Sequence, residues 1–67
     1  MKRVSGKEMC RALERQGWHL DRIRGSHHVY KNASGSLVSV PVHGSKTLKP
    51  GTQRGIMKDA GLTEADL

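Results

Sequence analysis

The sequence predicts an α+β domain that runs in the order helix, three antiparallel strands, helix. Three observations lead to this class. An amphipathic helical pattern follows a capping sequence near the N-terminus, short segments separated by turn residues fill the middle, and a second helical pattern follows a polar loop. The 67-residue chain can support only one core, because a chain this short buries about 60% of its unfolded surface. We therefore expect a single domain over residues 1–67.

The N-terminal region carries the signals of a complete helix. Ser5 and Glu8 have the Ser-x-x-Glu spacing of a capping box, in which two side chains satisfy backbone donors at a helix start. Gly17 readily adopts the left-handed conformation that closes a helix. The predicted helix runs from about Gly6 to Gln16. One side of it carries the residues Met9, Ala12, Leu13 and Gln16.

The middle of the chain is predicted to form antiparallel hairpins. The segments Trp18–Arg24, His27–Lys31 and Leu37–Val42 have the length and composition of strands. Turn residues separate them, with Gly25-Ser26 after the first and Asn32-Ala33-Ser34-Gly35 after the second. These segments form the three strands of the expected sheet.

The third predicted strand alternates most clearly. Val38, Val40 and Val42 recur at every second position and should face the core. Pro41 lacks a backbone donor, which is tolerated at a strand end or at the edge of a sheet. We therefore expect this strand to lie at an edge. Trp18, at the start of the first strand, is expected in the core.

A second helix is predicted after a polar loop. His43–Pro50 reads as that loop, and Thr52 can cap a helix of about Gln53–Ala60, which Gly61 would close. Gly55 lies inside this helix and costs about 1 kcal/mol relative to Ala. We therefore expect the helix to depend on tertiary packing.

The charge is strongly positive and unevenly distributed. The formal net charge is +6, and all 12 Lys and Arg lie within residues 1–58, whereas the last nine residues carry three acids and no base. Such a field attracts phosphate polymers and acidic proteins alike. Lys7, Arg11 and Arg15 form a basic stripe at helical spacing. This stripe is either a solvated face or a contact for a phosphate or a partner.

The single cysteine and the hydropathy of the chain indicate the cellular compartment of the protein. Cys10 is the only cysteine, which excludes an intramolecular disulfide and fits a reducing compartment. No run approaches the roughly 18 apolar residues of a membrane span, and the first residues lead into no apolar signal core. We expect a soluble, cytoplasmic protein without a membrane partner.

Metal binding and serine catalysis fit the sequence poorly. His27 and His28 are neighbours on a predicted strand, so their side chains point to opposite faces and cannot readily chelate one ion. No metal or other cofactor is expected. Ser26 has neither the strand-to-helix elbow nor the oriented base that a catalytic serine needs. It should shape the turn or donate a hydrogen bond.

General acid/base chemistry on RNA fits better. Histidine with Lys or Arg can remove the 2′-hydroxyl proton, protonate the leaving 5′-oxygen and stabilise charge on the phosphate. By alternation His27 shares the side of Val29 and His28 shares the side of Tyr30, so only one of them faces any given groove. A surface or hydrogen-bonded core position is the alternative for each. Trp18 and Tyr30 are the only aromatic residues, which disfavours a platform for stacking bases.

Four ordered blocks that span nearly the whole chain resemble the HicA (YcfA-like) family of bacterial toxins, known as mRNA interferases. The blocks are Gly25-x-His27-x-x-Tyr30, Val40-Pro41-x-His43, Leu48-x-x-Gly51-Thr52 and Ala60-Gly61-Leu62-Thr63. The resemblance implies a double-stranded-RNA-binding-domain-like fold, with a three-stranded antiparallel sheet and two helices on one face.

The resemblance also implies a function. It points to the toxin of a type II toxin–antitoxin system, a metal-independent endoribonuclease that cleaves mRNA and inhibits translation, with His27 as general acid/base. Gly25, Ser26 and His43 are possible supporting or secondary residues. Basic residues expected near the site are candidates for binding RNA phosphate: Arg24, Lys46 and Lys49. The implied partners are mRNA and a HicB antitoxin that covers the active site.

Two other functions remain open at this stage. A non-catalytic RNA-binding module could use the same fold and basic surface. The basic surface could instead be a docking site for an acidic protein, with no role in RNA binding.

Overall fold

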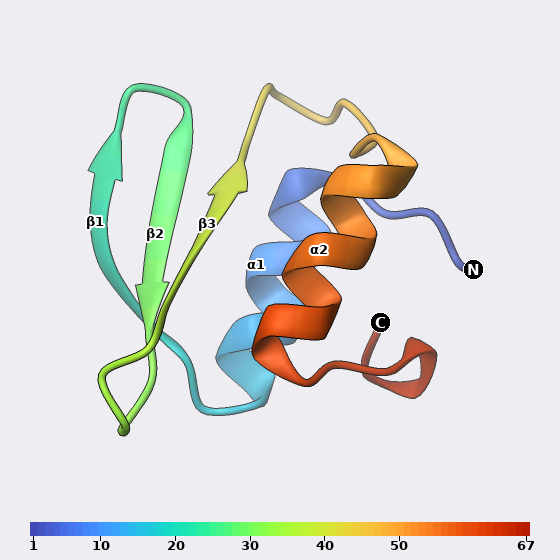
Figure 1. Cartoon of the computed structure of the whole chain (residues 1–67). Coiled ribbons are helices and arrows are strands. Elements are labelled where there is room, and N and C mark those ends of the chain that lie inside the picture. The colour runs from blue at the N-terminus through green and yellow to red at the C-terminus, as the bar shows by residue number, and fades with distance from the viewer.

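A computed structural model describes all 67 residues and has the predicted order of elements. In chain order the elements are α1 (Gly6–Arg15), β1 (His19–Arg24), β2 (His27–Lys31), β3 (Leu37–Pro41), α2 (Pro50–Ala60) and the 3₁₀ turn η1 (Glu64–Asp66). Both helices lie on the same face of an open three-stranded antiparallel sheet, and the other face of the sheet is uncovered (Figure 1). The predicted fold class is thus confirmed.

The first helix begins where its capping box predicts. The Glu8 backbone N–H donates to the Ser5 hydroxyl at 3.2 Å, and the Ser5 N–H donates to a Glu8 carboxylate oxygen at 2.8 Å. The helix ends at Arg15, and Gly17 follows at a φ of +91°. Gln16, expected on the apolar side, is exposed instead and donates to the Asp66 carboxylate at 3.0 Å. The buried face of α1 consists of Gly6, Met9, Cys10, Ala12 and Leu13.

The strand order β1-β2-β3 places β3 at an edge, as predicted from Pro41. β1 begins one residue later than predicted, because Trp18 turns into the core and is only 6% exposed. The pairing of β1 with β2 shifts between Leu20 and Arg22. Such a bulge leaves an extra residue on the edge strand, here Asp21. β3 ends at Pro41, one residue short of the predicted end.

The core lies between the sheet and the two helices. Tyr30 pairs with Val38 and His28 pairs with Val40 across β2 and β3, so these four residues share the face that the helices cover. Tyr30 is 2% exposed and Val40 is fully buried. Helix α2 adds Ile56 and Met57 to the same cluster of buried residues. The predicted alternation of β3 is therefore confirmed for Val38 and Val40, whereas Val42 lies beyond the strand and is half-buried against the core.

The predicted start of the second helix is wrong. The helix begins at Pro50, three residues before Gln53, and its N-cap is Lys49, which makes no side-chain capping bond. Proline is favoured at the first helical position, because its φ suits the helix and its missing N–H has no partner there. Thr52 therefore lies within the first turn and is not the cap. Gly61 ends the helix at a φ of +69°, as predicted.

The N-terminal segment is held beside the second helix by a buried amide. The Gln53 side chain is fully buried; it accepts a hydrogen bond from the Val4 N–H at 3.2 Å and donates one to the Lys2 carbonyl oxygen. The Leu48 N–H donates to the Val4 carbonyl at 2.9 Å. This network packs residues 2–5 against the segment before α2. None of the helices combines the length and apolarity needed to cross a membrane.

Candidate functional site

The two adjacent histidines of β2 lie on opposite faces of the sheet. His27 pairs with Arg24 on one side and with Pro41 on the other, on the uncovered face. His28 pairs with Ile23 and with the buried Val40, on the face that the helices cover. Any single groove can therefore use only one of the two imidazoles, as strand alternation predicts.

His27 is exposed at the end of the β1–β2 hairpin. Gly25, in the turn before it, has a φ of +60°, a backbone conformation that glycine adopts without a steric penalty. The Ser26 carbonyl accepts a hydrogen bond of 2.7 Å from the Val42 N–H, which holds the hairpin end against the chain leaving β3. Arg24 lies beside His27 and forms no ion pair. Gly25 and Ser26 thus shape the backbone around His27.

His28 is half-buried and lines a hollow of about 290 Å³ between the sheet and α1. The other lining residues are Lys7, Cys10, Arg11, Glu14, Leu20, Tyr30 and Val42. Two members of the predicted basic stripe, Lys7 and Arg11, therefore line the same hollow as an imidazole. Arg15, the third member, is directed elsewhere and donates to the Asp66 carbonyl at 2.9 Å.

The hollow around His28 contains a carboxylate held by a hydrogen bond and two groups with raised pKa values. The Tyr30 hydroxyl donates to a Glu14 carboxylate oxygen at 2.7 Å. Burial, reinforced by this bond, raises the pKa of Tyr30 above its ordinary value. Burial also raises the pKa of the Cys10 thiol. The Tyr30 hydroxyl and the Cys10 thiol therefore keep their protons near pH 7.

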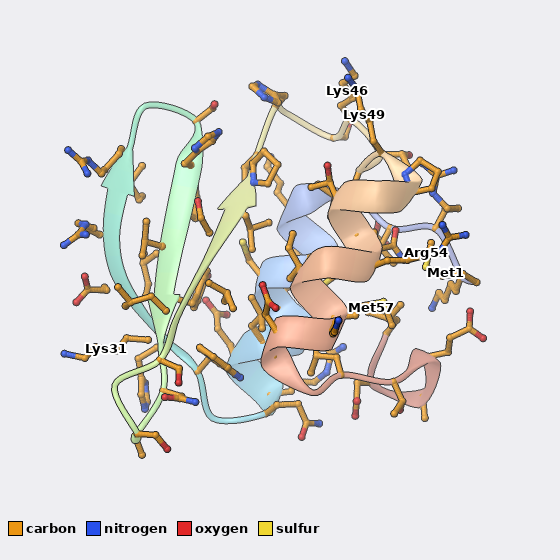
Figure 2. All side chains as sticks on the ribbon, viewed as in Figure 1. Met1, Lys31, Lys46, Lys49, Arg54 and Met57 are labelled. Carbon is orange, nitrogen blue, oxygen red and sulfur yellow. The ribbon has the colours of Figure 1, made fainter.

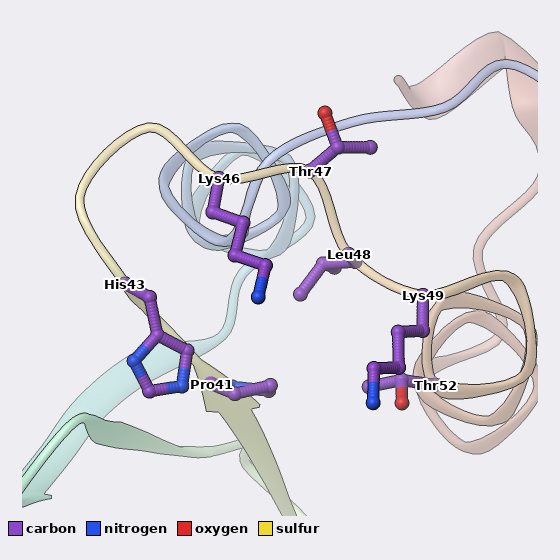
Figure 3. Close-up of a pocket in the computed structure, with 7 residues that line it drawn as sticks. All are labelled: Pro41, His43, Lys46, Thr47, Leu48, Lys49 and Thr52. Carbon is purple, nitrogen blue, oxygen red and sulfur yellow. The ribbon is translucent and has the colours of Figure 1, made fainter.

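A second hollow, of about 270 Å³, lies between the end of β3 and the start of α2. Its lining residues are Pro41, His43, Lys46, Thr47, Leu48, Lys49 and Thr52. Figure 3 shows the side chains of His43, Lys46 and Lys49 directed toward the same space from different parts of the loop. No acidic residue lines this hollow.

The regions around His27, His28 and His43 meet where the chain leaves β3. Pro41 is the strand partner of His27 and a wall of the second hollow, Val42 lines the hollow of His28, and His43 points into the second hollow. Sequence reasoning missed the roles of Glu14 and Tyr30 in the hollow of His28. Strand alternation puts Tyr30 beside His28, but only the docking of α1 brings Glu14 to it.

The structure contains no group of three His, Cys, Asp or Glu side chains that could hold a metal ion. Imidazole and lysine line both hollows, and the hollow of His28 adds an arginine, the Glu14 carboxylate, a tyrosine hydroxyl and a thiol. Such groups can move protons and bind phosphate without a metal.

The fold and these sites define a small basic α+β protein that gathers imidazoles and unpaired cations around one strand end. A model of the HicA toxins of bacterial toxin–antitoxin systems matches residues 6–62. The chain therefore belongs to the HicA toxin family, as the four sequence blocks predicted. A search of curated proteins found no match. Family membership makes the chain a toxin component whose partner is an antitoxin.

Proposed function

We propose that this toxin is a metal-independent endoribonuclease that cleaves mRNA and thereby inhibits translation. The observation that carries the proposal is the meeting of imidazoles with unpaired lysine and arginine side chains around the end of β3. An imidazole can take the 2′-hydroxyl proton or supply one to the leaving 5′-oxygen, and the cations stabilise charge that develops on the phosphate.

The proposed general acid/base is His27, the position that the family resemblance implies. It is exposed, and its neighbour Arg24 has no carboxylate partner within the chain. RNA lying on the uncovered face of the sheet could reach both groups. Lys46 and Lys49 are proposed to bind phosphate next to His27. Pro41 is the strand partner of His27 and also lines the hollow of the two lysines, so the hollow lies close to this histidine.

His28 is the competing candidate, and its surroundings favour it. It lines a hollow in which Lys7 and Arg11 supply positive charge and Glu14 is held by Tyr30. A half-buried imidazole with fixed polar neighbours is better oriented than an exposed one on an open sheet face. The two histidines thus define two alternative centres for the same reaction.

Cleavage in the presence of EDTA tests the reaction and chooses between the centres. Purified toxin is expected to cut RNA in EDTA, and alanine at the catalytic histidine is expected to lower the cleavage rate by at least about 100-fold. His27→Ala and His28→Ala are compared with His19→Ala, which alters an exposed histidine at the far end of β1. Circular dichroism checks that each variant is folded. Full activity of both His27→Ala and His28→Ala would contradict acid/base catalysis from β2.

A non-catalytic RNA-binding module remains the alternative because the same basic surface serves either function. It predicts RNA affinity that falls steeply with salt, intact RNA after incubation, and no growth arrest on expression. Growth arrest by the wild-type chain, relieved by alanine at the catalytic histidine at equal protein level, supports the nuclease.

The proposed protein partner is a HicB-type antitoxin acting in the cytoplasm. Its binding would cover the end of β3 and so exclude RNA from the imidazoles and the cations together. Copurification of the two proteins, with loss of RNA cleavage in the complex, tests this arrangement.

A further inference from the structure

The hollow beside His43 has the composition of an anion site. Lys46 and Lys49 approach it from the loop before α2, and Thr52 adds a hydroxyl from the first helical turn (Figure 3). Figure 2 shows both lysines at the same end of the molecule, whereas Lys31 lies at the opposite end of the sheet. Two lysines and a histidine thus line one depression of about 270 Å³.

The positive charge of this hollow is not neutralised within the chain. The ion pairs of the structure join the N-terminal ammonium to Glu64 at 3.2 Å and Arg22 to Asp21 at 3.5 Å. Most of the other acids are bound elsewhere. Glu8 closes the capping box, Glu14 accepts from Tyr30, and Asp66 accepts from Thr63 and Gln16. Lys46 and Lys49 are thus free to pair with an external anion.

We propose that this hollow binds a backbone phosphate of the RNA strand next to the cleaved bond, and that His43 contacts this phosphate and does not transfer the proton. The inference rests on the proposed ribonuclease function, which it deepens by assigning a separate anchoring subsite. Pro41 joins the hollow to His27, and Val42 joins it to the hollow of His28. The anchored phosphate therefore lies beside the reacting one whichever imidazole cleaves.

The lining favours a nucleic-acid phosphate over a protein partner. Centres of protein interfaces are depleted in lysine and rich in aromatic residues. Here the exposed lining is lysine, histidine and threonine, and Leu48 is 5% exposed because it packs into the core. Contacts from Lys, Thr and backbone donors are those that proteins use to position phosphates.

Binding to an RNA with 2′-O-methyl groups tests the subsite apart from cleavage, because such an RNA lacks the nucleophile. Lys46→Ala and Lys49→Ala are each expected to weaken binding about three- to fivefold. Together they should reduce the slope of log affinity against log salt by about 0.7 to 1.4 in magnitude. Lys58→Ala removes the same charge from the far end of α2 and should change neither quantity by more than a fraction of this.

Steady-state cleavage then tests the role of His43. His43→Ala is expected to raise KM about three- to fivefold and to leave kcat within about twofold, whereas alanine at the cleaving histidine lowers kcat. A 100-fold loss of kcat in His43→Ala would overturn its assignment to the anchoring subsite.

The two proposals fail separately. If the toxin cleaves RNA but Lys46→Ala and Lys49→Ala bind 2′-O-methyl RNA with the wild-type salt slope, the anchoring subsite is wrong and the nuclease stands. If Lys58→Ala weakens RNA binding as much as Lys46→Ala and Lys49→Ala do, the positive surface attracts RNA without a defined site, and the subsite is also wrong. If the salt slope falls as expected but no RNA is cut, the hollow binds RNA phosphate, whereas the nuclease proposal and the placement of that phosphate beside a cleaved bond both fail.

Discussion

Gly6, the first residue of α1, packs directly against the chain leaving β3. A methyl group at this position would collide with the carbonyl oxygen of Pro41 and touch Val42. The backbones of α1 and β3 can therefore approach closely only because residue 6 has no side chain. This contact holds Pro41 and Val42, which join the regions of the candidate histidines, against the N-terminal end of α1.

Alanine at Gly6 is expected to lower the free energy of unfolding by about 1–3 kcal/mol, because overpacking displaces backbone. The matched control is Gly55→Ala, since a methyl group there meets no atom within 4 Å. That change should stabilise the protein by about 0.5–1 kcal/mol through helix propensity. Urea denaturation measures both values. Equal stability of the two variants would contradict the close contact.

The raised pKa of the Tyr30 hydroxyl should make the free energy of unfolding depend on pH under alkaline conditions. Burial raises its pKa in the folded state, so above about pH 10 the unfolded chain loses a proton that the folded chain keeps. The free energy of unfolding should then fall by up to about 1.4 kcal/mol per pH unit for this group. Cys10, whose pKa is also raised by burial, adds a similar decline that begins at a lower pH.

Phenylalanine at position 30 tests this linkage. Tyr30→Phe removes the 2.7 Å hydrogen bond to Glu14, at a cost of about 1 kcal/mol near pH 7. It should also make the decline between pH 10 and 11 shallower than in the wild type. Urea denaturation from pH 8 to 11 provides the comparison. An unchanged slope would mean that Tyr30 ionises alike in both states.

At the scale of elements, the two helices begin in different ways. Helix α1 starts with a complete capping box, whereas α2 starts with Lys49 and Pro50 and without a side-chain cap. The capping box is a local pattern, so the sequence predicted it correctly. Thr52 also fits a capping pattern, but Pro50 begins the helix first because its φ is already helical.

Alanine substitutions at the two candidate cap residues test where each helix begins. Ser5→Ala should cost about 1 kcal/mol of stability, since it leaves the Glu8 N–H without its acceptor. Thr52→Ala should change stability by less than about 0.5 kcal/mol, because Thr52 is exposed and lies inside the helix. Thermal or urea unfolding measures both. A larger loss in Thr52→Ala than in Ser5→Ala would contradict the observed start of α2.

The whole molecule carries more positive charge than its own acids neutralise. The net charge is +6, and the structure contains two ion pairs. Self-repulsion of this kind destabilises the compact state and is screened by salt. The cations that bind no carboxylate include those of both hollows.

Moderate salt is therefore expected to stabilise the free toxin. Raising NaCl from about 20 to 200 mM should increase the free energy of unfolding by up to about 1 kcal/mol, or Tm by roughly 4–8 °C. Differential scanning calorimetry measures the change, and sucrose at equal osmolality controls for effects unrelated to charge. A decrease in Tm with NaCl would show that the ion pairs outweigh the repulsion.

The sequence by itself determined the fold class, the first helix, the three strands and the opposite orientation of His27 and His28. These features follow from local periodicity and capping, which act over a few residues. The resemblance to the HicA family rests on four short sequence blocks, which are also local patterns, and the family match confirmed it.

Only the tertiary structure decided which side chains meet. It buried Gln53 against the N-terminal segment, brought Glu14 and two cations of the basic stripe to His28, and gathered Lys46 and Lys49 with His43. These contacts join residues up to 51 positions apart in the chain. They depend on how the helices dock on the sheet, which local periodicity does not specify.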